Sequence, residues 1–105
     1  MFKNEVIEIE RVSITTDEAG DQVKESTWRE VFAEKKSIGA REFYQAHADG
    51  LQPEYKFVVH STEYDRTIDG PGIKYLGRRY KIIRVYEADF ENVELTVEGD
   101  IHANA

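Results

Sequence analysis

The stretch IKYLGRRYKIIRVY, residues 73–86, contains two runs of alternating apolar and polar residues on either side of a glycine. Apolar residues at every second position are typical of a β-strand that turns one face to a core. Gly77 can adopt a positive φ angle, which a tight turn requires. The stretch therefore predicts a β-hairpin with its turn at residues 77–79.

Alternating patterns of the same kind continue toward both ends of the chain. We expect strands at residues 5–14, 23–35, 55–60, 73–76, 80–86 and 95–97, with polar turns at 15–21 and 87–92 and a long polar loop at 61–72. Six short strands separated by turns favour a small β-barrel or sandwich, because closing a sheet removes its exposed edges. The prediction is a mainly β, single-domain β-barrel over residues 1–105 with one inserted short α-helix.

The first two strands depart from simple alternation. In the first, the apolar phase slips between Ile9 and Val12, which predicts a bulge near Glu10 and Arg11. In the second, apolar residues at 28 and 31–33 occupy both faces, so we expect both faces to be covered. The residues predicted to form the core are Trp28, Phe32, Phe57, Ile82, Val85 and Leu95.

The stretch SIGAREFYQAHADG, residues 37–50, interrupts the strands with a helical pattern. Ser37 is a candidate N-cap and Gly50 a candidate C′ residue, which predicts a helix over residues 38–49. An isolated helix of this length is marginal in water, so packing must hold it. It either plugs one end of the barrel or binds a neighbouring subunit, and both roles are compatible if only part of its apolar stripe is covered. That stripe comprises Ala40, Phe43, Tyr44, His47, Ala48 and Leu51.

The composition is that of a folded domain without thiol chemistry. The 105 residues include 40% hydrophobic residues and no cysteine, which fits one globular domain and excludes disulfides, thiol catalysis and zinc–cysteine sites. No apolar run approaches the roughly 18 residues of a membrane span, and the N-terminal residues lack the apolar segment of a signal peptide. We therefore expect a soluble, unexported protein with no membrane partner.

The net charge of −7 conceals one basic region. Residues 74–86 contain no acidic residue, and their basic residues are interleaved with Tyr75, Tyr80 and Tyr86. This pattern fits base stacking and phosphate contacts with nucleic acid. It also fits ordinary strand residues whose cations are solvated or pair with an acidic loop of a neighbouring subunit, such as residues 87–94. The basic residues are Lys74, Arg78, Arg79, Lys81 and Arg84.

Residues capable of catalysis or metal binding do not form a recognisable motif. The histidines, His47, His60 and His102, are far apart, and no HExxH, EF-hand or GxSxG pattern is present. The DGPG stretch, residues 69–72, lacks the lysine of a phosphate-binding loop and is predicted to be a turn. We expect neither enzyme activity nor a metal or other cofactor.

The order of these segments resembles the bacteriophage head-tail joining proteins, also called head closure or head-tail connector proteins. A strand that holds Trp28 runs into a helix in TWREVFAEKKSIGAREFYQAHA, residues 27–48. A glycine hairpin precedes a final strand in IKYLGRRYKIIRVYEADFENVELTV, residues 73–97. In that family a VWAEV-like strand leads to a GREYFEA-like helix, and a YDGRxYxIxxV hairpin precedes a Leu-rich strand. This chain has YLGRRYKIIRV, with Leu76 where an aspartate often stands, and the likeness extends over about residues 5–98.

The resemblance implies a structural virion protein that is assembled in the bacterial host cytoplasm and sits at the head–tail interface. It implies a ring of copies, dodecameric by the resemblance, that binds the portal or adaptor protein and closes the head after DNA packaging. The ring would then offer a platform to a tail-terminator or tail-completion protein, while packaged DNA passes through without sequence-specific binding. The alternatives are an OB-like single-stranded nucleic-acid-binding module and a minor tail or tail-completion subunit of similar fold.

Residues outside the expected core are the candidates for contacts between copies or with partners. We expect the helix to mediate ring contacts or to narrow the channel, and residues 101–105 to be a frayed or partner-ordered tail. The candidates lie on the helix, in the long loop and in the basic hairpin: Arg41, Glu42, Phe43, Tyr44, His47, Asp69, Arg78, Arg79 and Lys81.

Overall fold

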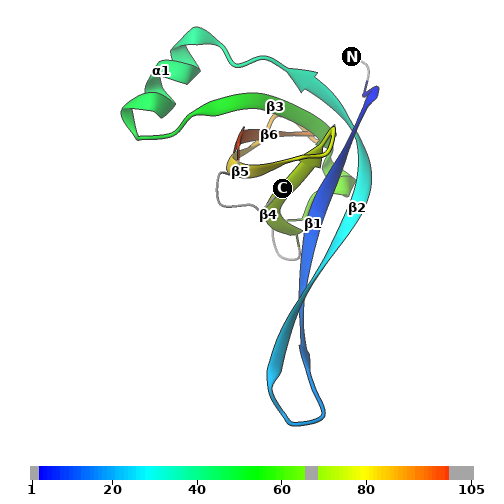
Figure 1. Cartoon of the computed structure of the whole chain (residues 1–105). Coiled ribbons are helices and arrows are strands. Elements are labelled where there is room, and N and C mark those ends of the chain that lie inside the picture. The colour runs from blue at the N-terminus through cyan, green and yellow to red at the C-terminus, as the bar shows by residue number, and fades with distance from the viewer. Residues whose placement is uncertain (1–2, 66–68, 100–105) are drawn as a thin grey trace.

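A computed structural model describes residues 3–65 and 69–99 of the chain. Six antiparallel strands close into a barrel in the order β1-β2-β3-β6-β5-β4, and one short helix, α1, lies outside it (Figure 1). This confirms the predicted fold. The elements are β1 (Glu5–Thr16), β2 (Gln22–Lys36), α1 (Ala40–Ala48), β3 (Pro53–His60), the 3-10 turn η1 (Ser61–Glu63), β4 (Asp69–Tyr75), β5 (Arg78–Glu87) and β6 (Asn92–Gly99).

The barrel interior is filled by side chains that alternate along every strand, as the period of a strand requires. Phe57 lies at its centre and is fully buried, as are Ile9 and Leu95. Aromatic rings of Tyr55 and Tyr75 meet Phe57 at centroid distances of 6.1 and 5.1 Å. The buried cluster consists of Ile7, Ile9, Val31, Ala33, Phe57, Val59, Ile73, Tyr75, Tyr80, Val93, Leu95 and Val97.

Four of the residues predicted to form the core lie elsewhere or only at its border. Ile82 and Val85 are partly buried and pack against the core. Phe32 is 67% exposed, because Val31 and Ala33 point inward and the residue between them must point outward. The sequence also misplaces Trp28, whose half-buried ring lies on the outer face of β2 opposite Glu10 of β1.

The β1–β2 hairpin extends beyond the barrel as a two-stranded arm (Figure 1). Strand β2 pairs with β3 only from Ala33 to Lys36, whereas its pairing with β1 continues to Gln22 at the arm tip. Ile14 and Val23 on the arm are therefore exposed, and the prediction that β2 is covered on both faces is wrong. The arm gives the protein a longest dimension of 51 Å.

Two hairpin turns follow from local chemistry. At the arm tip, the Asp17 carboxylate accepts hydrogen bonds from the backbone N–H groups of Ala19 and Asp21, as the polar sequence there predicts. Between β4 and β5, Leu76 and Gly77 adopt φ angles of 51° and 78°. Two consecutive positive φ angles suit a two-residue hairpin turn, so the turn falls one residue earlier than predicted.

The segment predicted to be a loop at residues 61–72 contains regular structure at both ends. It begins with η1, and its DGPG stretch is not a turn but the start of β4. Glycine lets β4 pack closely on its neighbours, because a Cβ atom at Gly72 would lie 3.0 Å from the Trp28 ring and one at Gly70 would lie 3.1 Å from a Val12 methyl group. The register of β1 against β4 shifts between Ile9 and Arg11, which confirms the predicted bulge.

Helix α1 lies outside the barrel beside β3 rather than plugging one end. None of its residues is buried, so the plug prediction is wrong. The helix begins at Ala40 with Gly39 as its N-cap, and no side chain caps it, so Ser37 does not have the predicted role. Gly50 adopts a φ angle of 81° after the helix, as predicted for a C′ residue.

We expect alkaline pH to destabilise the barrel through Tyr80. Burial raises the pKa of the Tyr80 phenol above its ordinary value of 10.0, because ionisation would place a charge in the core. The neutral phenol's contribution is therefore complete below about pH 10 and is lost as pH rises through the folded-state pKa. Urea unfolding at pH 8 and pH 11 should show a smaller pH-dependent loss in Tyr80→Phe than in the parent. An equal loss in both would contradict this, and Tyr86→Phe at an exposed ring is the control.

Candidate functional site

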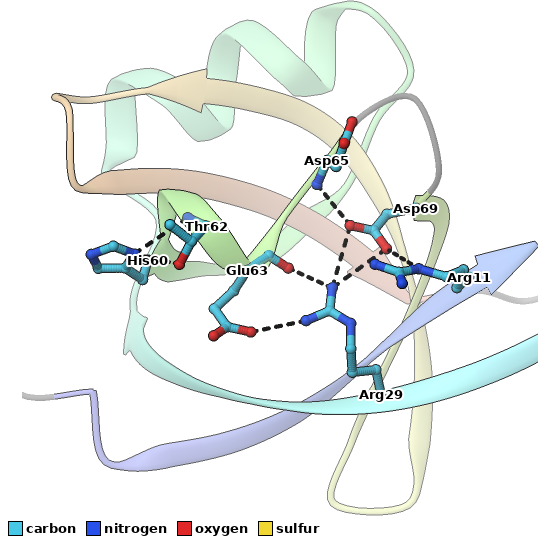
Figure 2. Close-up of polar contacts among 7 residues, drawn as sticks. All are labelled: Arg11, Arg29, His60, Thr62, Glu63, Asp65 and Asp69. Atoms are coloured by element: carbon cyan, nitrogen blue, oxygen red, sulfur yellow. Dashed lines mark hydrogen bonds and ion pairs between the residues drawn. The ribbon is translucent and has the colours of Figure 1, made fainter.

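A buried carboxylate organises the end of the barrel from which the arm emerges (Figure 2). The side chain of Asp69, at the start of β4, is fully buried. Its oxygens lie 3.4 Å from Nε of Arg11 and 3.4 Å from a terminal guanidinium nitrogen of Arg29. It also accepts a 2.7 Å hydrogen bond from the backbone N–H of Asp65. Two cations and one backbone donor thus compensate for the removal of Asp69 from water.

The same network fixes the segment that follows β3. Arg29 also forms a 2.9 Å ion pair with Glu63 and donates a hydrogen bond to the Glu63 carbonyl oxygen. The His60 ring accepts a hydrogen bond from the backbone N–H of Thr62 and thereby caps η1. Figure 2 shows these groups converging from β1, β2, η1 and β4. Asp69 is therefore paired within its own chain, and its contact with a partner stays a prediction.

Sequence reasoning missed Arg11 and Arg29, although a signal for both exists. Each lies two residues from a buried apolar residue, Ile9 in β1 and Val31 in β2, and therefore shares its inward phase. An arginine that points inward at the end of a core predicts an anionic partner nearby, although the Arg11 and Arg29 side chains stay 41% and 31% exposed. Asp69 provides that anion, since it is the β4 partner of Arg11.

Ion pairs mount α1 on the outside of the barrel. Glu42 of α1 lies 2.6 Å from the Lys56 ammonium of β3 and 3.6 Å from the Arg84 guanidinium of β5. Lys56 also pairs with Glu94 of β6 at 3.7 Å. Glu42 is thus turned toward its own barrel, and its contact with a partner stays a prediction.

The aromatic stripe of α1 faces away from the barrel. Phe43 and Tyr44 are 38% and 70% exposed, and His47 is exposed beside them. The Phe43 ring stacks on His47 at 5.8 Å and meets Tyr44 edge-on at 5.9 Å. The predicted residues Phe43, Tyr44 and His47 therefore share one outward surface, which we call the α1 face. Arg41 is also exposed, but its helical position lies about 160° from that of Phe43. A helix with its aromatic side in water presents that side for contact.

The basic residues of the β4–β5 hairpin are compensated within the chain. Lys74 and Arg79, which are cross-strand partners, both lie over the Trp28 ring, at 4.1 and 5.2 Å from its centroid. Arg78 pairs with Glu54 at 3.3 Å and Lys81 with Glu98 at 3.6 Å. The predicted site residues of this hairpin therefore form in-chain pairs and do not lie with the aromatic residues of α1.

Two of the three tyrosines of the basic hairpin cannot stack on bases. Tyr75 and Tyr80 are 5% and 4% exposed inside the barrel. A hydrogen bond to Glu5 raises the pKa of the Tyr75 phenol, which donates to a Glu5 carboxylate oxygen at 2.8 Å. This geometry removes the aromatic platform that single-stranded nucleic-acid binding requires.

In residues 3–65 and 69–99, no group of three or more His, Asp or Glu side chains could hold a metal ion. No helix there is long and apolar enough to cross a membrane. The predicted tail, residues 101–105, and His102 lie outside the described residues.

The family of phage head completion proteins matches this sequence over residues 3–99, which is nearly the whole barrel, arm and helix. The chain belongs to this family. A search of curated proteins found no match. As a head completion protein it is a structural, non-enzymatic component of the phage virion at the head–tail junction. The resemblance noted in the sequence is thereby confirmed.

We expect Asp69→Asn to destabilise the fold. The variant retains an acceptor for the Asp65 N–H group but removes the anion that faces Arg11 and Arg29. Loss of charged hydrogen bonds predicts a decrease of about 1 to 3 kcal/mol in the free energy of unfolding, measured with urea. Glu18→Gln, at an exposed arm residue, is the control and should change stability by less than about 0.5 kcal/mol. Equal stability of the two variants would show that the buried ion pairs do not matter.

Proposed function

We propose that this head completion protein forms a ring at the portal vertex, closes the head after DNA packaging and provides the platform to which the tail attaches. Family membership over residues 3–99 supports the location, and one observation carries the ring. The barrel core is complete without α1, whose aromatic face is left in water. A rigid scaffold that presents such an element is suited to assembly with other proteins.

The charge distribution supports passage of DNA rather than binding. The chain has a net charge of −7, and Arg78, Lys81 and Arg84 are already paired with carboxylates of the same chain. A protein that offers few free cations makes few phosphate contacts. A ring of such chains would let packaged DNA pass without holding it.

The direct test adds the purified protein to DNA-filled heads that carry their portal. We expect density that caps the portal vertex in electron micrographs, DNA that is retained in the head, and heads that then join tails. The opposite result is a protein that ignores heads but shifts single-stranded oligonucleotides with a steep salt dependence, which would favour the nucleic-acid-binding alternative.

Replacing both Phe43 and Tyr44 with alanine separates assembly from stability. Tyr44 is 70% and Phe43 38% exposed, and neither belongs to the buried core, so the free energy of unfolding should fall by no more than about 1 kcal/mol. Aromatic residues dominate binding at interfaces, so DNA retention and tail joining should fall by about tenfold or more. Gln45→Ala on the same helix is the matched control. Particles of the double variant that retain DNA and join tails normally would contradict the role of α1.

A further inference from the structure

The β1–β2 arm is a sheet of only two strands that nothing in the described chain covers (Figure 1). Every residue from 13 to 27 is exposed, so the outer part of both strands lies in water. A two-stranded hairpin is at best marginally stable by itself, and a third strand or a packed face is what normally stabilises it. Among residues 3–65 and 69–99 the outer arm has neither.

The two faces of the arm are poorly suited to a packed partner. Ile14 and Val23 are the large apolar residues exposed on the outer arm, at 61% and 38%. Ile14 is directly opposite Lys24, whereas Val23 is directly opposite Thr15. Because successive residues of a strand point to opposite faces, Ile14 and Val23 lie on opposite sides of the arm. Contact through either face would therefore cover only one large apolar side chain.

The backbone edge of β2 is better suited to binding than either face. Residues 22–32 pair with β1 on one side, and in the described chain β3 pairs with the other side only from Ala33 to Lys36. The exposed part of this edge, residues 22–27, spans roughly 20 Å, which is the usual length of a strand. Free N–H and C=O groups along an edge are a template for another strand. Residues 22–27 contain no proline, and their register with β1 is continuous, so no bulge prevents a third strand from pairing.

The charge of the arm disfavours a second copy as that third strand. Residues 13–27 contain four carboxylates and one cation, Lys24. None of these groups forms an ion pair within residues 3–65 and 69–99. Two such arms side by side would repel each other, whereas a strand rich in Lys or Arg would be attracted. The carboxylates are those of Asp17, Glu18, Asp21 and Glu25.

We propose that the arm is a strand-addition site, at which an extended basic segment of another virion protein pairs with β2 along residues 22–27. In this mode of recognition, backbone hydrogen bonds supply the affinity and side chains at alternate positions supply the specificity. Lys or Arg side chains of the segment approach Glu25 and the carboxylates of the arm tip. The inference rests on the proposed function only for the particle in which it is tested, and it adds a contact with a different protein.

The register of the arm allows its strands to be tested separately from its turn. Ser13 is opposite Glu25, so replacing residues 14–24 with Asn-Gly gives a two-residue hairpin turn and removes the free edge. Thr16 is opposite Gln22, so replacing residues 17–21 with Asn-Gly keeps the edge and removes only the turn. Neither replacement touches the buried core, and circular dichroism checks the fold of both variants.

The two arm variants should differ in tail joining. The short arm loses several backbone hydrogen bonds to the segment, so the fraction of heads that join tails should fall by about tenfold or more. The turn replacement loses only exposed charges, so its fraction should fall by about threefold at most. Equal losses in the two folded variants would place the contact at the turn and overturn the inference. Normal tail joining by the short arm would also overturn it, while the proposed function would stand.

Photo-cross-linking in finished particles identifies the partner. Tailed particles are assembled with protein in which the photoreactive residue benzoylphenylalanine replaces Ser26 of β2, and cross-linked peptides are sequenced after irradiation. We expect cross-links to one Lys- or Arg-rich segment of another virion protein. The same replacement at Leu76, which is 84% exposed on the β4–β5 turn, is the control and should not reach that segment. Cross-links from Ser26 to another copy of this chain, or to no protein, would overturn the inference.

Hydrogen exchange distinguishes strand pairing from contact between side chains alone. We expect the amides of residues 22–27 to exchange about tenfold or more slowly in tailed particles than in the free protein, because a third strand binds the free edge. Unchanged exchange in particles would overturn strand addition. If the parent protein fails to complete heads, both this inference and the proposed function are overturned.

Discussion

The buried carboxylate of Asp69 is the constraint on which the arrangement of the arm and the barrel depends. The pairing of β1 with β4 closes the barrel, and it ends at the register pair Arg11 and Asp69. The buried apolar residues Ile9 of β1 and Val31 of β2 are followed at this level by Arg11 and Arg29. The fully buried Asp69 carboxylate pairs with both arginines, so the apolar core stops at this level and the two strands continue as an arm.

Helix α1 turns a charged residue toward its own barrel and its aromatic residues toward water, the reverse of the usual orientation of an amphipathic helix. An apolar stripe normally packs on the core, yet Glu42 faces the barrel and the aromatic residues face water. The barrel leaves no space that requires a plug, since its interior is already filled by the side chains of six strands. Ion pairs can therefore hold the helix at a defined position without covering its stripe.

Periodicity was sufficient to predict the strands, the barrel and the existence of one helix, because each of these follows from local alternation. It could not predict which faces are covered. Phe32 and Trp28 were assigned to the core since both are large and apolar, but the inward phase belongs to Val31 and Ala33. The DGPG stretch was predicted to be a turn because it contains two glycines but lacks the lysine of a phosphate-binding loop. In the fold those glycines instead allow Glu10 and Trp28 to approach β4 closely.

The distribution of charge divides the protein's surface into paired and unpaired parts. Most cations of β5 form ion pairs with carboxylates of the same chain, so the positive charge of this strand is largely neutralised within the protomer. Such exposed pairs add little to stability, but they remove free positive charge that would hold phosphate. The exposed aromatic residues of α1 take no part in these ion pairs. A surface suited to contact with other proteins and a shortage of free cations for phosphate can therefore coexist in one small acidic protein, because each depends on a different set of residues.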